Sequence, residues 1–385
     1  MKSLAFVYYA PNDVRTETKE VKGGRDDLVV KVRACGRCGT DKTIFTKGHP
    51  KVDSHAPIIL GHELSAEIVE VGSNVKNMRR GIGYKEGETL SPEYLDFEEG
   101  ERIVVQSRIA RYNNGLMLIH EPITILSFYI DGGYSQYMRI PKELIQSGSV
   151  LRIPENASDE DALLVEPAAC ALESIFASPH QVGVDKEGRH TYRSGIQRMG
   201  YTAIIGSGTV GLMYARLARI EGAKKVFVFV RSAEKEKMVH DILGPEAICY
   251  NMDGKSQPEI VEETKSLTDG HLFDDVISAC SDTDAQRLML ELFTHEGYAV
   301  GAVFGGAHAI ADSANLDNLH YRMAKAIGTS GCSTRTMETI IQWLETGKLK
   351  LEGFCSKRKW TFRDSPSEFF TARDGGLKPV LDPWG

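Results

Sequence analysis

The hydrophobic pattern divides the chain into two parts. In the first 165 or so residues, short runs rich in β-branched residues alternate with polar, glycine-punctuated stretches. This pattern predicts strands, and their spacing predicts an irregular, barrel-like β domain. The predicted strands are residues 28–32, 66–71, 102–106 and 134–140. Residues 80–100, which are dense in glycine and glutamate, predict a surface loop.

From about residue 170 the pattern changes to apolar strands that alternate with helical periodicity. Residues 201–205 and 225–230 predict buried strands, and apolar residues between them recur at helical spacing from Val210 to Ile220. Residues 275–279 and 298–304 repeat the strand pattern, and a polar segment, 183–200, precedes the first strand. Strands that alternate with helices indicate an α/β fold with a doubly wound parallel sheet.

Composition supports a globular, two-domain protein. The 385 residues are 42% hydrophobic and 26% charged, with a formal net charge of −7. A chain without a basic footprint is not expected to bind nucleic acid, and no apolar run approaches the ~20 residues that span a bilayer. The seven cysteines are scattered and odd in number. We therefore expect reduced thiols, a cytoplasmic location and no membrane partner.

A glycine motif lies between the first strand and helix of the second part. The six residues are Gly206, Ser207, Gly208, Thr209, Val210 and Gly211. In a dinucleotide site, the first glycine makes the tight turn, the second lets the main chain approach the pyrophosphate, and the third lets helix and strand pack closely. The alternative is a plain strand–turn–helix, but the flanking strands and helix favour dinucleotide binding.

The end of the second strand bears on cofactor choice. NAD sites place a carboxylate there for the ribose 2′-hydroxyl, whereas this chain has Val230 followed by Arg231, Ser232 and, nearby, Lys235. Arginine binds a phosphate through two hydrogen bonds. The sequence predicts a preference for NADP(H). NAD(H) stays open, because Arg231 can also be a solvated strand end in an enzyme that uses either cofactor.

Four residues are candidate metal ligands: Cys38, His62, Glu63 and Glu166. Thiolate, imidazole and carboxylate suit a catalytic Zn²⁺ site with one open position. Three of them have ordinary structural alternatives: Cys38 as a buried thiol, His62 as a core histidine and Glu166 as a residue at a helix start. Cys35 and Cys38 form a CxxC without a second CxxC, so a four-cysteine structural zinc is not expected.

Taken together, these motifs resemble the zinc-type medium-chain dehydrogenase/reductase family. The matching segments, in the family's order, are residues 36–41, 61–63, 100–105, 131–137, 166–167 and 206–211. The resemblance implies a GroES-like, β-rich catalytic domain (1–170), a Rossmann domain (171–332) and a return to the catalytic domain (333–385), with one catalytic zinc. The family's structural-zinc lobe has no counterpart in the cysteine-free region around residues 85–115.

The resemblance also implies roles for single residues. Cys38, His62 and Glu166 align with zinc ligands, and Glu63 with an exchangeable carboxylate that can take part in catalysis. Thr40 aligns with the hydroxyl that passes on the substrate proton. The main chain around Val303 is expected at the nicotinamide ring.

Glu166-Pro167 is similar to the sorbitol and threonine dehydrogenase branch. Thr43 and Ile44 depart from the residues typical of those two enzymes, and the details are most similar to the L-sorbose-1-phosphate reductase subgroup. A substrate phosphate needs cations. The candidates are Lys42, Lys47, Arg111, Arg189, Arg193, Arg198, His320 and Arg322.

The resulting expectation is a zinc-dependent oxidoreductase that moves hydride between NADP(H) and the carbonyl or secondary alcohol of a sugar phosphate. One alternative is an NAD(P)-dependent dehydrogenase of an unphosphorylated polyol or cyclitol. Another is a non-catalytic dinucleotide-binding protein. The resemblance suggests a homodimer or homotetramer, with residues 298–304 at the contacting edge of the sheet.

Overall fold

The computed structural model describes residues 1–78, 95–108, 112–113, 116–117, 125–295, 300–303 and 317–385. The chain forms two compact units, one of Met1–Pro167 with Cys332–Gly385 and the other of Ala168–Gly331. That these units are the three-segment domains expected from the sequence stays a prediction. Most of the predicted loop 80–100 lies outside the described residues, as do Arg111, Tyr298 and Phe304.

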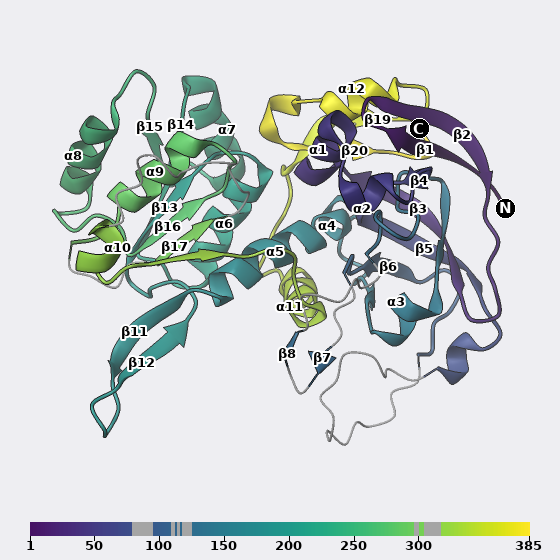
Figure 1. The fold of residues 1–385 in the computed structure, drawn as a ribbon, viewed down its shortest axis with the longest axis horizontal. Helices are drawn as coiled ribbons and strands as arrows, with labels where there is room; N and C mark the ends of the chain where they lie inside the picture. The colour runs from purple at the N-terminus through teal and green to yellow at the C-terminus, as the bar shows by residue number, and fades with distance from the viewer. Residues whose placement is uncertain (79–94, 109–111, 114–115, 118–124, 296–299, 304–316) are drawn as a thin grey trace. The chain divides into compact units, whose positions relative to one another are not determined.

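The first unit is built from antiparallel strands, with one parallel pair between β19 and β20 (Figure 1). One sheet has the order β2-β1-β4, a larger one has the order β10-β6-β5-β3-β20-β19 with β9 also on β3, and β7 pairs β8. The strands are β1 (Lys2–Ala10), β2 (Asp13–Glu20), β3 (Leu28–Gly36), β4 (Ile58–Ile59), β5 (Glu63–Val71), β6 (Arg102–Val105), β7 (Tyr112–Asn113), β8 (Leu116–Met117), β9 (Tyr137–Ile140), β10 (Val150–Arg152), β19 (Cys355–Trp360) and β20 (Lys378–Leu381).

Short helices complete this unit. They are α1 (Gly39–Lys47), α2 (Pro50–Asp53), α3 (Lys142–Gln146), α4 (Asp159–Leu163), α11 (Thr334–Glu345) and α12 (Pro366–Thr371), with 3₁₀ turns η1 (Val75–Asn77) and η2 (Asp374–Gly376). Helix α5 (Val165–Phe176) begins in this unit and continues into the next.

The pairing of β3 with β5 positions the candidate metal residues. Strand β3 is mostly buried, but Lys31 is partly exposed and Arg33 is exposed, so polar and apolar residues alternate in its middle as in an antiparallel strand with one face towards solvent. Its register against β5 pairs Leu28 with Val71 at one end and Gly36 with Glu63 at the other. The segment that leaves β3 after Gly36 and the segment that enters β5 at Glu63 therefore lie side by side.

The second unit contains the predicted doubly wound parallel sheet, in the order β15-β14-β13-β16-β17-β18. Its strands are β13 (Tyr201–Ile205), β14 (Lys225–Val230), β15 (Ile248–Asn251), β16 (Asp275–Ser278), β17 (Val300–Val303) and β18 (Lys325–Gly328). Its helices are α6 (Thr209–Ile220), α7 (Ala233–Leu243), α8 (Gln257–Leu267), α9 (Thr283–Glu291) and α10 (Asp317–Tyr321). The α/β expectation is confirmed.

One expectation about this unit is wrong. Residues 300–303 are not an edge strand, because β17 pairs β16 on one side and β18 on the other, so β18 forms the edge. No helix or strand was predicted for the polar segment 183–200, and the structure places part of it in strands. It contributes to a hairpin of β11 (Pro179–Val184) and β12 (His190–Ser194), which extends away from the six-stranded sheet (Figure 1). Its strands carry few apolar residues, so hydrophobic periodicity did not reveal them.

Two further observations concern the described residues. No disulfide joins any of the seven cysteines, all of which lie in this part of the chain. No helix here has the length and apolar character that crossing a bilayer requires.

Candidate functional site

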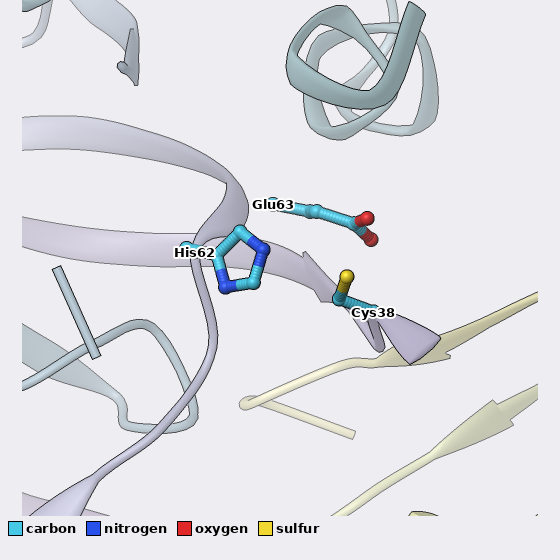
Figure 2. Close-up of side chains that lie close together, drawn as sticks. All are labelled: Cys38, His62 and Glu63. Carbon is cyan, nitrogen blue, oxygen red and sulfur yellow. The ribbon is translucent and has the colours of Figure 1, made fainter. Parts of the chain in front are cut away.

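Three of the four predicted metal ligands meet at the junction of β3, α1 and β5. The Cys38 thiol, a His62 ring nitrogen and a Glu63 carboxylate oxygen all lie within 4.8 Å of one another. Cys38 is the N-cap of α1, and Glu63 is the first residue of β5. Figure 2 shows the thiol and the carboxylate on one side, with one nitrogen of the imidazole turned towards them.

The buried carboxylate of Asp41 lies next to the imidazole ring of His62. Nδ1 of His62 lies 3.8 Å from Oδ1 of Asp41, and the His62 side chain is 11% exposed. Among the described residues, none donates a hydrogen bond to this Nδ1 atom or accepts one from it. Burial opposes the charged imidazole, but the negative charges of Asp41 and Cys38 outweigh it and raise the pKa of His62. The surroundings therefore favour a positive charge at this position.

Asp41 itself is held by two hydrogen bonds. The Tyr134 hydroxyl donates to Oδ2 of Asp41 at 2.6 Å, and the Cys38 main-chain N–H donates to the same oxygen at 3.1 Å. Both Asp41 and Tyr134 are fully buried. Burial raises the pKa of Asp41, although the nearby His62 and Tyr134 oppose the rise. Asp41 thus fixes the start of α1 and faces the imidazole.

A buried lysine, which the sequence did not indicate, accompanies Glu63. The Lys378 Nζ atom on β20 donates to Oε1 of Glu63 at 2.8 Å and lies 2.6 Å from Oε2. Both side chains are almost fully buried. Burial opposes the charged ammonium, but Glu63 and Cys38 outweigh it and raise the pKa of Lys378.

This donor set fits zinc. Thiolate, imidazole and carboxylate are the ligands that Zn²⁺ takes in proteins, at about 2.0–2.3 Å, and ligand atoms within 4.8 Å of one another surround such a point. The side chains come from the start of α1 and from the residues at the start of β5. The nearby carboxylate of Asp41 adds negative charge beside the cluster. A bound divalent cation would offset this charge.

Glu166 lies outside the group of atoms that meet within 4.8 Å. It is the second residue of α5, it is 7% exposed, and its Oε1 accepts a hydrogen bond from Ser107 Oγ at 3.3 Å. Its charge is near enough to contribute to the raised pKa of His62. Thr40, in the first turn of α1, is exposed. The roles of Glu166 as a ligand and of Thr40 in proton transfer stay predictions.

The glycine motif forms the turn between β13 and α6. Gly206 has a φ of 118°, a conformation that favours glycine. A Cβ atom on Gly211 would lie 1.9 Å from the carbonyl oxygen of Gly206, so only glycine allows this close packing. The N-cap of α6 is Gly208, which has no side chain to cap the helix. The main-chain N–H groups of the first turn of α6 point out of the N-terminal end of the helix, and this end of a helix favours the binding of an anion.

The other predicted cofactor residues follow the carboxyl ends of parallel strands, where open α/β sheets bind ligands. Arg231 follows β14, is largely exposed, and pairs with Asp282 at 3.3 Å. Ser232 is the N-cap of α7, and its Oγ accepts from the Lys235 N–H at 3.2 Å. Burial lowers the pKa of Lys235. Val303 is the last residue of β17.

Comparison with known proteins gives two family matches. Residues 24–83 match the alcohol dehydrogenase GroES-like domain, and residues 209–346 match the zinc-binding dehydrogenase family. Among characterised relatives, the (R,R)-butanediol dehydrogenase of Bacillus subtilis is 26% identical over 68% of this chain and 66% of the relative. The L-sorbose 1-phosphate reductase of Klebsiella pneumoniae is 25% identical over 90% of this chain and 80% of the relative.

Solved structures with a similar fold align with nearly the whole length of this chain. The crystal structure of 2R,3R-butanediol dehydrogenase from Bacillus subtilis has a TM-score of 0.78 at 22% identity and covers 99% of both chains. A zinc-binding dehydrogenase from Sinorhizobium meliloti, in a structure bound to NADP, has a TM-score of 0.76 at 19% identity over all of both chains. The two family matches, in their order along the chain, and this shared fold lead to one assignment. The chain belongs to the zinc-type medium-chain dehydrogenase/reductase family of oxidoreductases.

Proposed function

We propose that this protein is a zinc-dependent oxidoreductase that transfers hydride between NADP(H) and the carbonyl or secondary alcohol of a sugar phosphate. The observation that carries the proposal is the convergence of the Cys38 thiol, the His62 imidazole and the Glu63 carboxylate. The similarity to an L-sorbose 1-phosphate reductase over 90% of the chain supports the substrate class.

In this proposal Cys38, His62 and Glu166 hold the zinc, and Glu63 is the exchangeable carboxylate. A bound zinc ion supplies Lewis-acid polarisation of the substrate oxygen. Asp41 keeps the His62 ring in place, because its own position is fixed by Tyr134 and by the start of α1. Lys378 gives Glu63 a permanent charged partner, so the carboxylate remains compensated when it is not bound to metal.

Proton transfer and cofactor binding are the remaining roles, and we assign them to Thr40 in α1 and to residues of the parallel sheet. The Thr40 hydroxyl passes the substrate proton towards solvent. Residues 206–211 receive the pyrophosphate of the dinucleotide, whose nicotinamide ring supplies or accepts the hydride. Arg231, Ser232 and Lys235 face the adenosine 2′-phosphate, which underlies the preference for NADP(H), and the main chain at Val303 faces the nicotinamide.

A second candidate substrate is an unphosphorylated diol, polyol or cyclitol. The similarity to (R,R)-butanediol dehydrogenase, at 26% identity, favours it. The cations proposed for a substrate phosphate distinguish the two substrate classes, and two of them are already engaged within the protein. Arg193 donates to the carbonyl oxygen of Ile196. Arg322 donates to the carbonyl oxygens of Phe293 and Glu291. The absence of disulfides among the seven cysteines supports a cytoplasmic location. A homodimer or homotetramer stays a prediction.

The test is NADPH oxidation, followed by absorbance, with zinc-loaded protein. A ketohexose 1-phosphate is compared with the same ketohexose without phosphate. Faster turnover of the phosphorylated sugar supports the sugar-phosphate assignment. Reduction of the free sugar alone, or oxidation of a vicinal diol with NADP⁺ followed in the reverse direction, assigns the second substrate class. If no secondary alcohol or ketone is turned over with either NADP(H) or NAD(H), the proposal is contradicted.

A further inference from the structure

An ion pair crosses the carboxyl end of β13, where the glycine turn begins. Strands β14 and β16 flank β13 on opposite sides. Arg231 is the first residue after β14, and Asp282 lies on the loop after β16. Nη2 of Arg231 nevertheless lies 3.3 Å from Oδ1 of Asp282. The two side chains therefore meet across the strand that separates their elements.

The loop that carries Asp282 also packs on the glycine turn. A Cβ atom built on Gly206 would lie 3.3 Å from the carbonyl oxygen of Ala279, with the Cys280 Cβ next. Asp282 is the N-cap of α9, and its Oδ1 accepts the Ala285 N–H at 3.0 Å. The main-chain bond from Ala285 and the charge of Arg231 lower the pKa of Asp282. Asp282 is thus an ionised carboxylate held in place on the loop that packs against the glycine turn.

We propose that Asp282 is a specificity-determining residue for the cofactor, and that it weakens the preference for NADP(H) set by Arg231. The inference rests on the proposed function, because it requires a dinucleotide at residues 206–211. Val230 occupies the strand-end position where NAD sites place a carboxylate, and Asp282 brings a carboxylate to the same guanidinium from the loop after β16.

The physical basis is competition for one guanidinium. A 2′-phosphate carries about −1.5 to −2 charges at neutral pH. To bind Arg231 with two hydrogen bonds, it must share or displace Asp282, and the two anions repel each other. A ribose 2′-hydroxyl carries no charge and meets no such repulsion. Asp282 should therefore lower the affinity for 2′-phosphorylated ligands selectively.

The test measures binding, not turnover, on the full-length protein by calorimetry. The probes are adenosine 2′,5′-bisphosphate against AMP, and NADPH against NADH. D282N removes the charge, and asparagine keeps the N-cap of α9. We expect D282N to bind adenosine 2′,5′-bisphosphate about three- to tenfold more tightly, with AMP changed less than about twofold. The gain should shrink as salt is raised from low ionic strength.

The matched control is D284N, in the same helix. Asp284 is 69% exposed and pairs with Arg287, so its loss should leave the ratio of the two affinities unchanged. D282S, which also retains a capping side chain, gives a second variant should D282N unfold. An unchanged affinity ratio in both Asp282 variants, with wild-type protein binding NADPH, overturns the role of Asp282 alone. Wild-type protein that binds neither dinucleotide overturns the proposed function as well.

Discussion

The ammonium group of Lys378 on β20 lies 2.8 Å from Oε1 of Glu63 on β5, and the two residues are 315 positions apart in the sequence. Their side chains are only 6% and 2% exposed. Removing one member of a buried ion pair leaves the other charge buried without a partner. This lowers the free energy of unfolding far more than the loss of a surface ion pair does. The pair therefore joins the end of the chain to the candidate metal site.

Lys378→Met should destabilise the protein strongly. Leaving Glu63 buried without its cation should lower the free energy of unfolding by about 3–5 kcal/mol, measured by urea denaturation. Lys359→Met on the adjacent strand β19 is the control, because Lys359 pairs with Glu160 at the surface and should lose less than about 1 kcal/mol. Equal losses in the two variants would refute the buried-pair account.

The contrast between Cys38 and Lys378 shows what the sequence could reveal about the site. Cys38, His62 and Glu63 stand in short motifs of metal-binding residue types, so they were candidates before any fold was known. Lys378 is one lysine among many near the end of the chain. Only the pairing of β20 with β3 brings it to Glu63. Glu166 also stands in such a motif, but in the structure it lies outside the group of Cys38, His62 and Glu63.

Gly211→Ala tests the dinucleotide turn. The added methyl group would lie 1.9 Å from the carbonyl oxygen of Gly206, and this backbone cannot move without opening the turn. We expect a loss of at least about 3 kcal/mol in urea-measured stability and loss of NADPH binding by calorimetry. In Gly328→Ala, on strand β18, no atom of the described residues other than its chain neighbours lies within 4 Å of the new Cβ, so both quantities should stay near wild type. NADPH binding by Gly211→Ala as tight as wild type would exclude this packing role.

The second unit was the more predictable part of the fold. Its buried strands are continuous apolar runs, so β13 and β14 match their predicted ranges. The order of the strands in the sheet could not be predicted from the sequence. That order makes β18 the edge and brings Asp282 across β13 to Arg231. Such contacts join residues that are far apart in the sequence, and the local hydrophobic pattern carries no information about them.

Stability should fall at alkaline pH through Cys355. Burial raises the pKa of this thiol from 9.0 to about 12 in the folded protein. Its contribution to stability is therefore complete below about pH 9 and is lost as pH rises from 9 to 12, because the unfolded chain ionises first. The slope from this residue approaches about 1.4 kcal/mol per pH unit. Urea unfolding between pH 8 and 11 should show a shallower decline for Cys355→Ala, and parallel declines in the two proteins would contradict this assignment.

The metal content of the protein tests the central claim most directly. Protein purified without chelator is analysed for zinc by mass spectrometry, beside Cys38→Ser, His62→Ala and, as a control, Cys249→Ser in the other unit. The account predicts about one zinc per chain in the wild type and in Cys249→Ser, and little or none in the other two variants. Wild-type protein that holds no zinc even after zinc is added, or full zinc retention by both site variants, would contradict it.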